Sequence, residues 1–202
     1  DLDILKAIRK AIGDNVKLMV DANCAYDATE TIRLVRQMES YDIYWFEEPV
    51  PPEDIEGSIE VKNNTNIRIA GGECECTRYG FRELITRRAV DILQPDVCIA
   101  GGFTEMQKII AMASAWNIQC IPHVWGTNVA IAASLHCYAA IPNIPGKINP
   151  PEPFFEYDRS PNPLREEATY ERFALKDSYI DIPQKPGLGV TVNMDFLNAK
   201  AL

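Results

Sequence analysis

The sequence predicts an α/β protein built as a (β/α)8 barrel. Apolar strands alternate with amphipathic helices, the pair repeats roughly every 25 residues, and a polar residue follows the apolar run of each predicted strand. These residues are Asp21, Glu47, Glu73, Asp96, His123 and Glu156. In such barrels the active-site groups come from the C-terminal ends of several strands. A doubly wound open sheet is disfavoured because no G-x-G-x-x-G loop follows the first strand.

The predicted elements follow one another along the chain. Apolar residues recur at helical spacing over residues 2–12, and Gly13 ends that helix. A short apolar strand follows at 16–20, and Asp27 is suited to cap the next helix at 29–38. The further predicted strands are 43–46, 67–70, 90–93, 118–121 and 154–156, and the further predicted helices are 51–62, 81–88, 104–115 and 128–140.

The strand pattern also predicts how the chain is organised. Six strands are predicted where a complete barrel has eight, so we expect strands 3 to 8 of an incomplete barrel. We assign residues 1–158 to this partial catalytic barrel, and residues 159–202 to a polar connector followed by short strands. The open edges of an arc of strands need cover from further residues or from another chain, and we expect a homo-oligomer.

The composition excludes several classes of partner. A net charge of −9 and a pI near 4.8 argue against a nucleic-acid-binding surface. No apolar run approaches the roughly 18 to 20 residues that cross a bilayer, and the N-terminus has no signal-peptide character. The six cysteines lie mostly in apolar segments and are expected to be reduced thiols. We therefore expect a cytoplasmic protein with neither a nucleic acid nor a membrane as partner.

Three carboxylates predict a metal site. Asp21, Glu47 and Glu73 end successive predicted strands. The ends of adjacent parallel strands lie side by side, so these groups would repel one another unless a cation lay between them. Oxygen-only ligands select a hard ion, which favours Mg²⁺ and allows Mn²⁺.

The next strand ends supply groups for proton transfer. Asp96 and His123 end two further strands, and a carboxylate bonded to one imidazole nitrogen leaves the other free to take a proton. Glu156, one strand further, is a candidate to hydrogen-bond a bound carboxylate. Asn23, two residues after Asp21, is a second candidate for substrate binding.

As a set, these motifs resemble the enolase superfamily, and within it the mandelate racemase subgroup. The matching motifs are Asp21-Ala22-Asn23, Phe46-Glu47-Glu48-Pro49, Gly72-Glu73, Gln94-Pro95-Asp96 and Pro122-His123. The resemblance implies that Asp21, Glu47 and Glu73 bind Mg²⁺, supported by Glu48. It also implies that His123 is a general acid/base held by Asp96, and that Glu156 contacts the carboxylate of a small-molecule substrate.

The resemblance covers the C-terminal barrel portion of that family. The segment Gly187-Leu188-Gly189-Val190 is similar to the return of the family's C-terminus to an N-terminal lid domain. We expect that lid domain, and the strand that usually carries a Lys-x-Lys pair, to lie outside these 202 residues.

The chemistry known for this superfamily begins with removal of the proton α to a carboxylate. If a β-hydroxyl then leaves, the enzyme is an acid-sugar dehydratase; if a proton returns on the other face, it is a racemase or epimerase. The segments 77–82 and 162–165 are more similar to the dehydratases. A third possibility is an inactive fragment that folds only by pairing with another chain.

Overall fold

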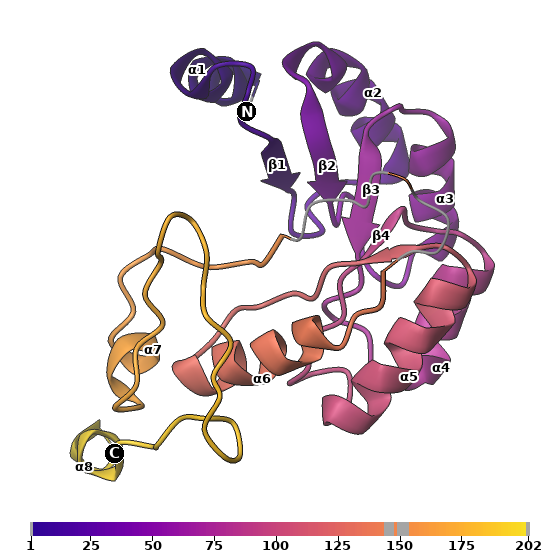
Figure 1. Ribbon diagram of the computed structural model, residues 1–202. Helices are drawn as coiled ribbons and strands as arrows, with labels where there is room; N and C mark the ends of the chain where they lie inside the picture. The colour runs from indigo at the N-terminus through magenta and orange to yellow at the C-terminus, as the bar shows by residue number, and fades with distance from the viewer. Residues whose placement is uncertain (1, 144–147, 149–153, 201–202) are drawn as a thin grey trace.

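A sheet of five parallel strands organises the protein (Figure 1). The computed structural model describes residues 2–143, 148 and 154–200. Within them the strands are hydrogen-bonded in chain order: β1 (Leu18–Asp21), β2 (Ile43–Glu47), β3 (Arg68–Gly71), β4 (Ile92–Leu93) and β5 (Gln119–Cys120). The predicted parallel βα array is confirmed for these five strands.

Most of the helices follow a strand and lie along the outer face of the curved sheet, whereas the last two lie apart from it beside the C-terminal loops (Figure 1). They are α1 (Leu2–Ile12), α2 (Ala28–Met38), the 3-10 helix η1 (Glu39–Tyr41), α3 (Ile55–Asn63), α4 (Thr77–Thr86), α5 (Gly102–Ala115), α6 (Asn128–Ala139), α7 (Pro163–Glu167) and α8 (Met194–Lys200). The first six α-helices overlap the predicted ranges, but α4 begins at Thr77 rather than at the predicted residue 81. Helix α3 begins later than predicted because Asp54 caps it, accepting a hydrogen bond from the Gly57 amide at 2.9 Å. No described helix is both long enough and apolar enough to span a bilayer.

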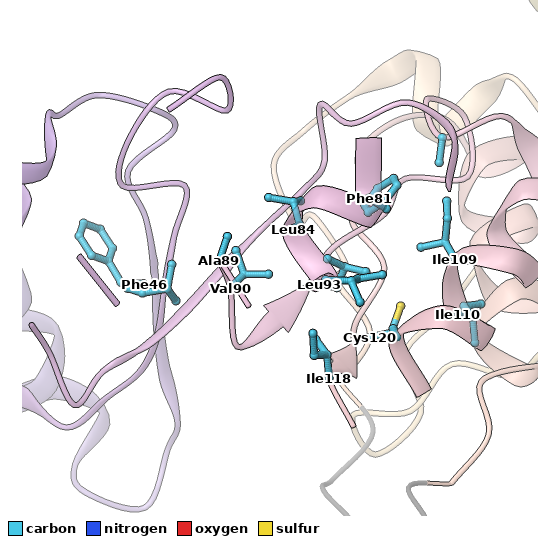
Figure 2. Close-up of a cluster of buried hydrophobic side chains, with 14 of the residues drawn as sticks. Phe46, Phe81, Leu84, Ala89, Val90, Leu93, Ile109, Ile110, Ile118 and Cys120 are labelled. Carbon is cyan, nitrogen blue, oxygen red and sulfur yellow. The ribbon is translucent and has the colours of Figure 1, made fainter. Parts of the chain in front are cut away.

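Alternation along the strands separates two apolar layers. Phe46 and Leu93 point outward into the main core between sheet and helices, where Phe81 and Ile109 are fully buried (Figure 2). Trp45, the neighbour of Phe46, belongs instead to a smaller inward cluster. That cluster also contains Ala70, Ile92 and Ile121, with Met19 and Phe154 packed against it. Each strand therefore presents one face to the helices and the other to the interior.

The prediction of a sixth strand at 154–156 is wrong, because these residues form no strand in the structure. Strand structure needs a paired backbone edge, and these residues are fixed by their side chains instead. The Phe154 ring packs edge-on against Tyr44, at 5.4 Å between centroids, and against Trp45 at 6.2 Å. One Glu156 oxygen accepts the Val124 amide at 2.6 Å. Glu156 still lies at the C-terminal ends of the strands, as predicted, but the segment forms no strand pairing with any described residue.

The C-terminal region differs from the predicted short strands. Two isolated bridges, Thr169 with Val192 and Lys176 with Tyr179, replace them. Two short helices, α7 and α8, were not predicted. Helix α7 has Asn162 as its cap and a proline in its first turn, but five residues are too few for a periodic apolar signal. The division at residue 158 stays a prediction.

Removing the cap of α2 is expected to weaken the fold modestly. The Asp27 carboxylate accepts a hydrogen bond from the Glu30 amide at 2.8 Å, satisfying a donor at the helix start. Asp27→Ala should lower the free energy of unfolding by about 1 kcal/mol. Urea denaturation measures this, with Asp14→Ala in an exposed turn as the control. Equal loss in both variants would contradict the capping role.

Candidate active site

A polar layer lies directly above the inward apolar layer. Along four strands and the residues that directly follow them, the residue two positions beyond an inward apolar residue is polar. Alternate residues of an extended chain share a face. The pairs are Met19 with Asp21, Trp45 with Glu47, Ile92 with Gln94, and Ile121 with His123. The sheet therefore brings these polar groups together at the C-terminal ends of its strands, where barrel active sites lie.

The predicted carboxylates gather on the first three strands. Asp21 is paired in register with Glu47 on β2, and Glu73 lies two residues beyond the end of β3. Glu47 is only 8% exposed and accepts a hydrogen bond from Trp45 Nε1 at 2.9 Å. Burial raises the pKa of Glu47 above its usual value, and the charges of Asp21 and Glu73 raise it further. Burial is also the main cause of the raised pKa of Glu73.

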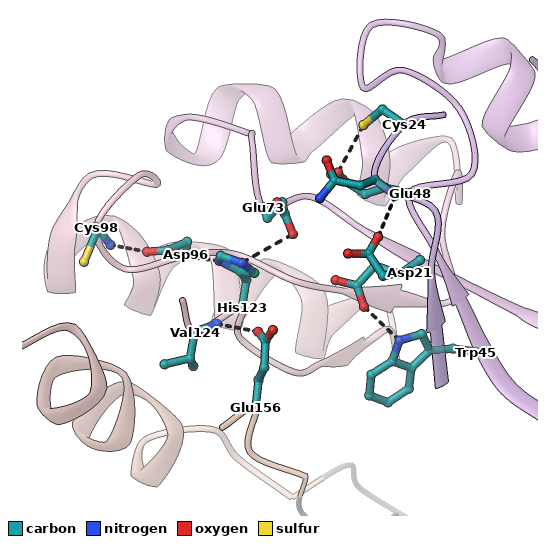
Figure 3. A network of polar contacts seen from close by, with 12 residues as sticks. Asp21, Cys24, Trp45, Glu48, Glu73, Asp96, Cys98, His123, Val124 and Glu156 are labelled. Carbon is teal, nitrogen blue, oxygen red and sulfur yellow. Dashed lines mark hydrogen bonds and ion pairs between the residues drawn. The ribbon is translucent and has the colours of Figure 1, made fainter. Parts of the chain in front are cut away.

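His123 and Asp96 form the predicted pair. His123 Nδ1 lies 2.7 Å from Asp96 Oδ2, and the other Asp96 oxygen accepts the Cys98 amide at 2.6 Å. His123 Nε2 lies 3.4 Å from Glu73 on the opposite side (Figure 3). Burial alone would lower the pKa of His123, but the Asp96 hydrogen bond and the charges of Glu156 and Glu73 outweigh it and raise the pKa to about 9. Nδ1 is thus engaged by Asp96, and Nε2 is the ring nitrogen that faces Glu73.

The two predicted substrate-binding residues differ in location: Glu156 lines the interior cavity, and Asn23 is exposed. Glu156 lines the interior cavity, its Oε2 accepts the Val124 amide, and burial raises its pKa. Asn23 is exposed and adopts a left-handed backbone with φ of 47°. Its backbone N–H donates to Asp21 Oδ1 at 2.7 Å and so orients that carboxylate. Binding of substrate by the Asn23 side chain stays a prediction.

A cavity of about 560 Å³ opens beside these groups. Asp21, Glu47 and Glu156 line its polar side, and Met19 and Trp45 line its apolar side. This volume is typical of a site for a small molecule. An anionic ligand here would need a cation, because the lining carboxylates repel it.

The donor set fits a hard divalent cation. Asp21, Glu47 and Glu73 offer only oxygen atoms, and the raised pKa values of the two glutamates indicate a need for positive charge. Their ligand atoms are not all within 4.8 Å of one another, a distance that Glu48, Glu73 and Cys74 do meet. Glu73 is turned towards His123 in this arrangement. The second set contains a thiol and would suit a softer ion.

Two further side chains contact the predicted acids, and neither was assigned a role from the sequence. Trp45 shares a face with Glu47, and alternation along the strand could have indicated that contact. Cys24 donates its thiol hydrogen to Glu48 Oε2 at 3.1 Å, which holds the buried Glu48 side chain. Nothing in the sequence pattern indicates the Cys24 contact. All six cysteines are free, as expected.

Gly72 positions Glu73, and a side chain there should disturb both fold and site. Its φ is +120°, and an added Cβ would lie 3.1 Å from the Phe81 ring. Gly72→Ala is expected to cost about 1–3 kcal/mol of stability and to weaken divalent-metal binding. Gly71→Ala is the control, since its Cβ would make ordinary contacts from 3.6 Å. Denaturation and metal titration measure both effects; equal behaviour of the two variants would contradict the role of Gly72.

Together, the parallel βα sheet and the His123–Asp96 pair and carboxylates at its strand ends define an α/β fold with a polar site at the C-terminal ends of the strands. The chain belongs to the enolase superfamily: residues 1–196 match the family described as enolase C-terminal domain-like.

Named relatives agree with this membership. The chain is 44% identical over 197 residues to D-galactarolactone cycloisomerase of Agrobacterium fabrum, covering 98% of this chain and 52% of that protein. The solved 3,6-anhydro-D-galactonate cycloisomerase from Zobellia galactanivorans superposes with a TM-score of 0.90 at 46% identity, covering 98% and 54%. A mutant L-talarate/galactarate dehydratase liganded with Mg and L-glucarate superposes at 0.84 with 31% identity, covering 98% and 46%. The chain thus spans about half the length of these relatives.

Proposed function

We propose that the protein removes the proton α to the carboxylate of a sugar-derived acid and expels an oxygen from the β carbon. The observation that carries the proposal is the position of His123, held by Asp96 at 2.7 Å with Nε2 turned towards the carboxylates. Asp21, Glu47 and Glu73 would hold Mg²⁺, or Mn²⁺ in its place. The bound ion would supply positive charge that offsets the charge developing on the substrate carboxylate.

His123 performs both proton transfers in this proposal. Asp96 fixes the tautomer at Nδ1, so Nε2 of the neutral imidazole accepts the α proton as the Cα–H bond breaks. A cation held by Glu73 would offset one of the negative charges that raise the pKa of His123, and so would favour this neutral form. The electron pair of that bond forms a Cα=Cβ double bond while the Cβ–O bond breaks. The proton on Nε2 then passes to the departing oxygen. Since one residue serves both steps, the hydrogen and the oxygen leave from the same face.

Glu156 would bind the carboxylate of the acid. Its Oε2 is occupied by the Val124 amide, which leaves Oε1 for the ligand. Burial raises the pKa of Glu156, so its protonated form is more accessible and can donate a hydrogen bond to a carboxylate oxygen.

The departing oxygen decides between two outcomes. A free hydroxyl leaves as water, which makes the enzyme a dehydratase. A ring oxygen on the β carbon stays attached to the product, so the ring opens and the product is an isomer. The two relatives at 44% and 46% identity are named as cycloisomerases, which favours this second candidate. Racemisation needs a second acid/base on the opposite face, whereas elimination from one face needs only His123 of the described residues.

Product mass separates these outcomes. The protein would be incubated with Mg²⁺ and a panel of open, lactone and anhydro sugar acids, and the products analysed by mass spectrometry. Loss of one water identifies a dehydratase, and an isomer of unchanged mass with an opened ring identifies a cycloisomerase. Deuterium taken up from D₂O at the α carbon of an otherwise unchanged acid would contradict elimination and identify a racemase or epimerase. No reaction across the panel would contradict the proposal.

A further inference from the structure

We propose that Glu48, Glu73 and Cys74 form a second cation site, which binds a thiophilic divalent ion such as Zn²⁺ and, when filled, weakens Mg²⁺ binding by engaging Glu73. One ligand atom from each of the three residues lies within 4.8 Å of the other two. Glu73 also belongs to the proposed Mg²⁺ ligands, together with Asp21 and Glu47. The binding of Zn²⁺ stands independently of the proposed function, and only its effect on Mg²⁺ and turnover rests on it.

The ends of two neighbouring strands bring these residues together. Glu48 directly follows β2, and its backbone N–H donates to Ala70 O of β3 at 3.0 Å. Its side chain runs beside the end of β3, because a Cβ on Gly71 would lie 3.6 Å from Glu48 Cγ. Glu73 and Cys74 come shortly after the last residue of β3. The sheet therefore fixes where the carboxylate that follows one strand meets the two ligands that follow the next.

Glu48 is a buried carboxylate that lacks a positive partner. It is 6% exposed, and the ion pairs of the described residues do not include it, since His123 pairs with Glu73 and Asp96 instead. Its Oε2 accepts a hydrogen bond from the Cys24 thiol at 3.1 Å, and a thiol is a weak donor. A carboxylate removed from water is costly unless a positive charge or strong hydrogen bonds offset the loss. The surroundings of Glu48 therefore favour a cation beside it.

Sulfur among the ligands selects the kind of ion. Mg²⁺ prefers oxygen ligands, whereas Zn²⁺ binds thiolates as well as carboxylate oxygens. Cys74 is exposed and Glu73 is partly exposed, so an ion can reach them from solvent. The Cys74 thiol would lose its proton to solvent as the metal–sulfur bond forms. The Cys24 thiol beside Glu48, or a water molecule, would complete the four ligands that Zn²⁺ prefers.

The shared Glu73 couples the two sites. An ion held by Glu48 and Cys74 would also engage the Glu73 carboxylate, and Mg²⁺ would then depend on Asp21 and Glu47. The coupling is reciprocal, because Mg²⁺ must lower the affinity for Zn²⁺ by the same factor. Low concentrations of Zn²⁺ are therefore expected to inhibit turnover, and excess Mg²⁺ is expected to relieve the inhibition.

Cd²⁺, which absorbs in the ultraviolet when it binds a thiolate, is the probe for this site. The metal-free protein would be titrated with Cd²⁺, and its affinities for Zn²⁺ and Mg²⁺ measured by calorimetry. The wild type should show the thiolate–metal band. Cys74→Ser should lose the band and bind Zn²⁺ at least about 10-fold more weakly, while it keeps the wild-type Mg²⁺ affinity. Cys76→Ser, at another exposed cysteine nearby, is the matched control and should keep the band.

Two further measurements test the carboxylates. Glu48→Gln keeps the shape of the side chain and removes its charge, so it should weaken Zn²⁺ binding more than Mg²⁺ binding. In the wild type, saturating Zn²⁺ should weaken Mg²⁺ binding by about 5- to 150-fold. Independent binding of the two ions would contradict the sharing of Glu73.

The thiolate band decides whether the site exists. A wild type without the band, or a band that Cys76→Ser also abolishes, would contradict the inference, the latter because Cys74 and Cys76 would then bind the ion together. A protein that binds both ions as expected but converts no acid of the panel would leave this site standing and make the proposed function wrong.

Discussion

His123→Asn is expected to lower kcat/KM by about 10²- to 10⁴-fold while leaving Mg²⁺ binding intact. Asparagine can keep a hydrogen bond to Asp96, which lies 2.7 Å from the imidazole, but it cannot accept and return a proton. His123 is not among the three predicted metal ligands, so metal affinity should be unaffected. Steady-state kinetics on an acid identified by the product screen, together with Mg²⁺ calorimetry, measure the two effects separately.

His136→Asn is the matched control for this substitution. His136 lies on α6, and its Nε2 is 3.3 Å from the Leu188 carbonyl oxygen, a contact that serves packing. The control variant should keep the wild-type rate. A near-normal rate for His123→Asn would show that another group moves the α proton.

Glu47→Gln is expected to weaken Mg²⁺ binding by at least about 100-fold, since even residues that only support metal ligands are worth 10- to 100-fold. The amide oxygen can still accept from Trp45 Nε1, so the local fold should survive. The melting temperature in EDTA should rise, because burial and the nearby Asp21 and Glu73 charges disfavour an ionised Glu47. Weaker metal binding together with higher stability is expected when a carboxylate serves function at a cost in stability.

Two companion variants make the Glu47 result specific. Glu60→Gln, exposed on α3, controls for the loss of one negative charge and should leave Mg²⁺ affinity unchanged. Glu48→Gln tests the neighbouring set, in which Glu48, Glu73 and Cys74 lie within 4.8 Å of one another. If Glu48→Gln abolishes Mg²⁺ binding and Glu47→Gln does not, the predicted ligands are wrong and this second set holds the metal.

Much of the sheet could be predicted because each strand has a short apolar run and a polar residue at its end. The helices that cover it carry clear periodic patterns, as in α2 and α5. The segment 154–156 shows the limit: its apolar side chains resemble a strand, yet backbone pairing depends on a neighbouring edge that the local sequence cannot specify. Helix α7 was missed for a different reason. It depends on the cap at Asn162 and on the ion pair between buried Arg165 and Asp158 rather than on periodicity.

The candidate site, too, could be predicted only in part from the sequence. Asp96 and His123 could be paired from their positions on successive strands, and the structure places them at hydrogen-bond distance. The hydrogen bond from Cys24 to Glu48 joins residues that follow different strands. Such contacts depend on side-chain conformations across the sheet, which spacing along the chain does not determine.

Release of the α hydrogen tests the central claim most directly. An acid identified by the product screen would be prepared with deuterium at its α carbon and incubated with the protein and Mg²⁺. The label in substrate and product would then be followed by mass spectrometry. We expect the wild type to form product without the α deuterium, and His123→Asn to leave the labelled acid unchanged. Product that still carries the α deuterium would contradict the assignment of His123 as the residue that removes this proton.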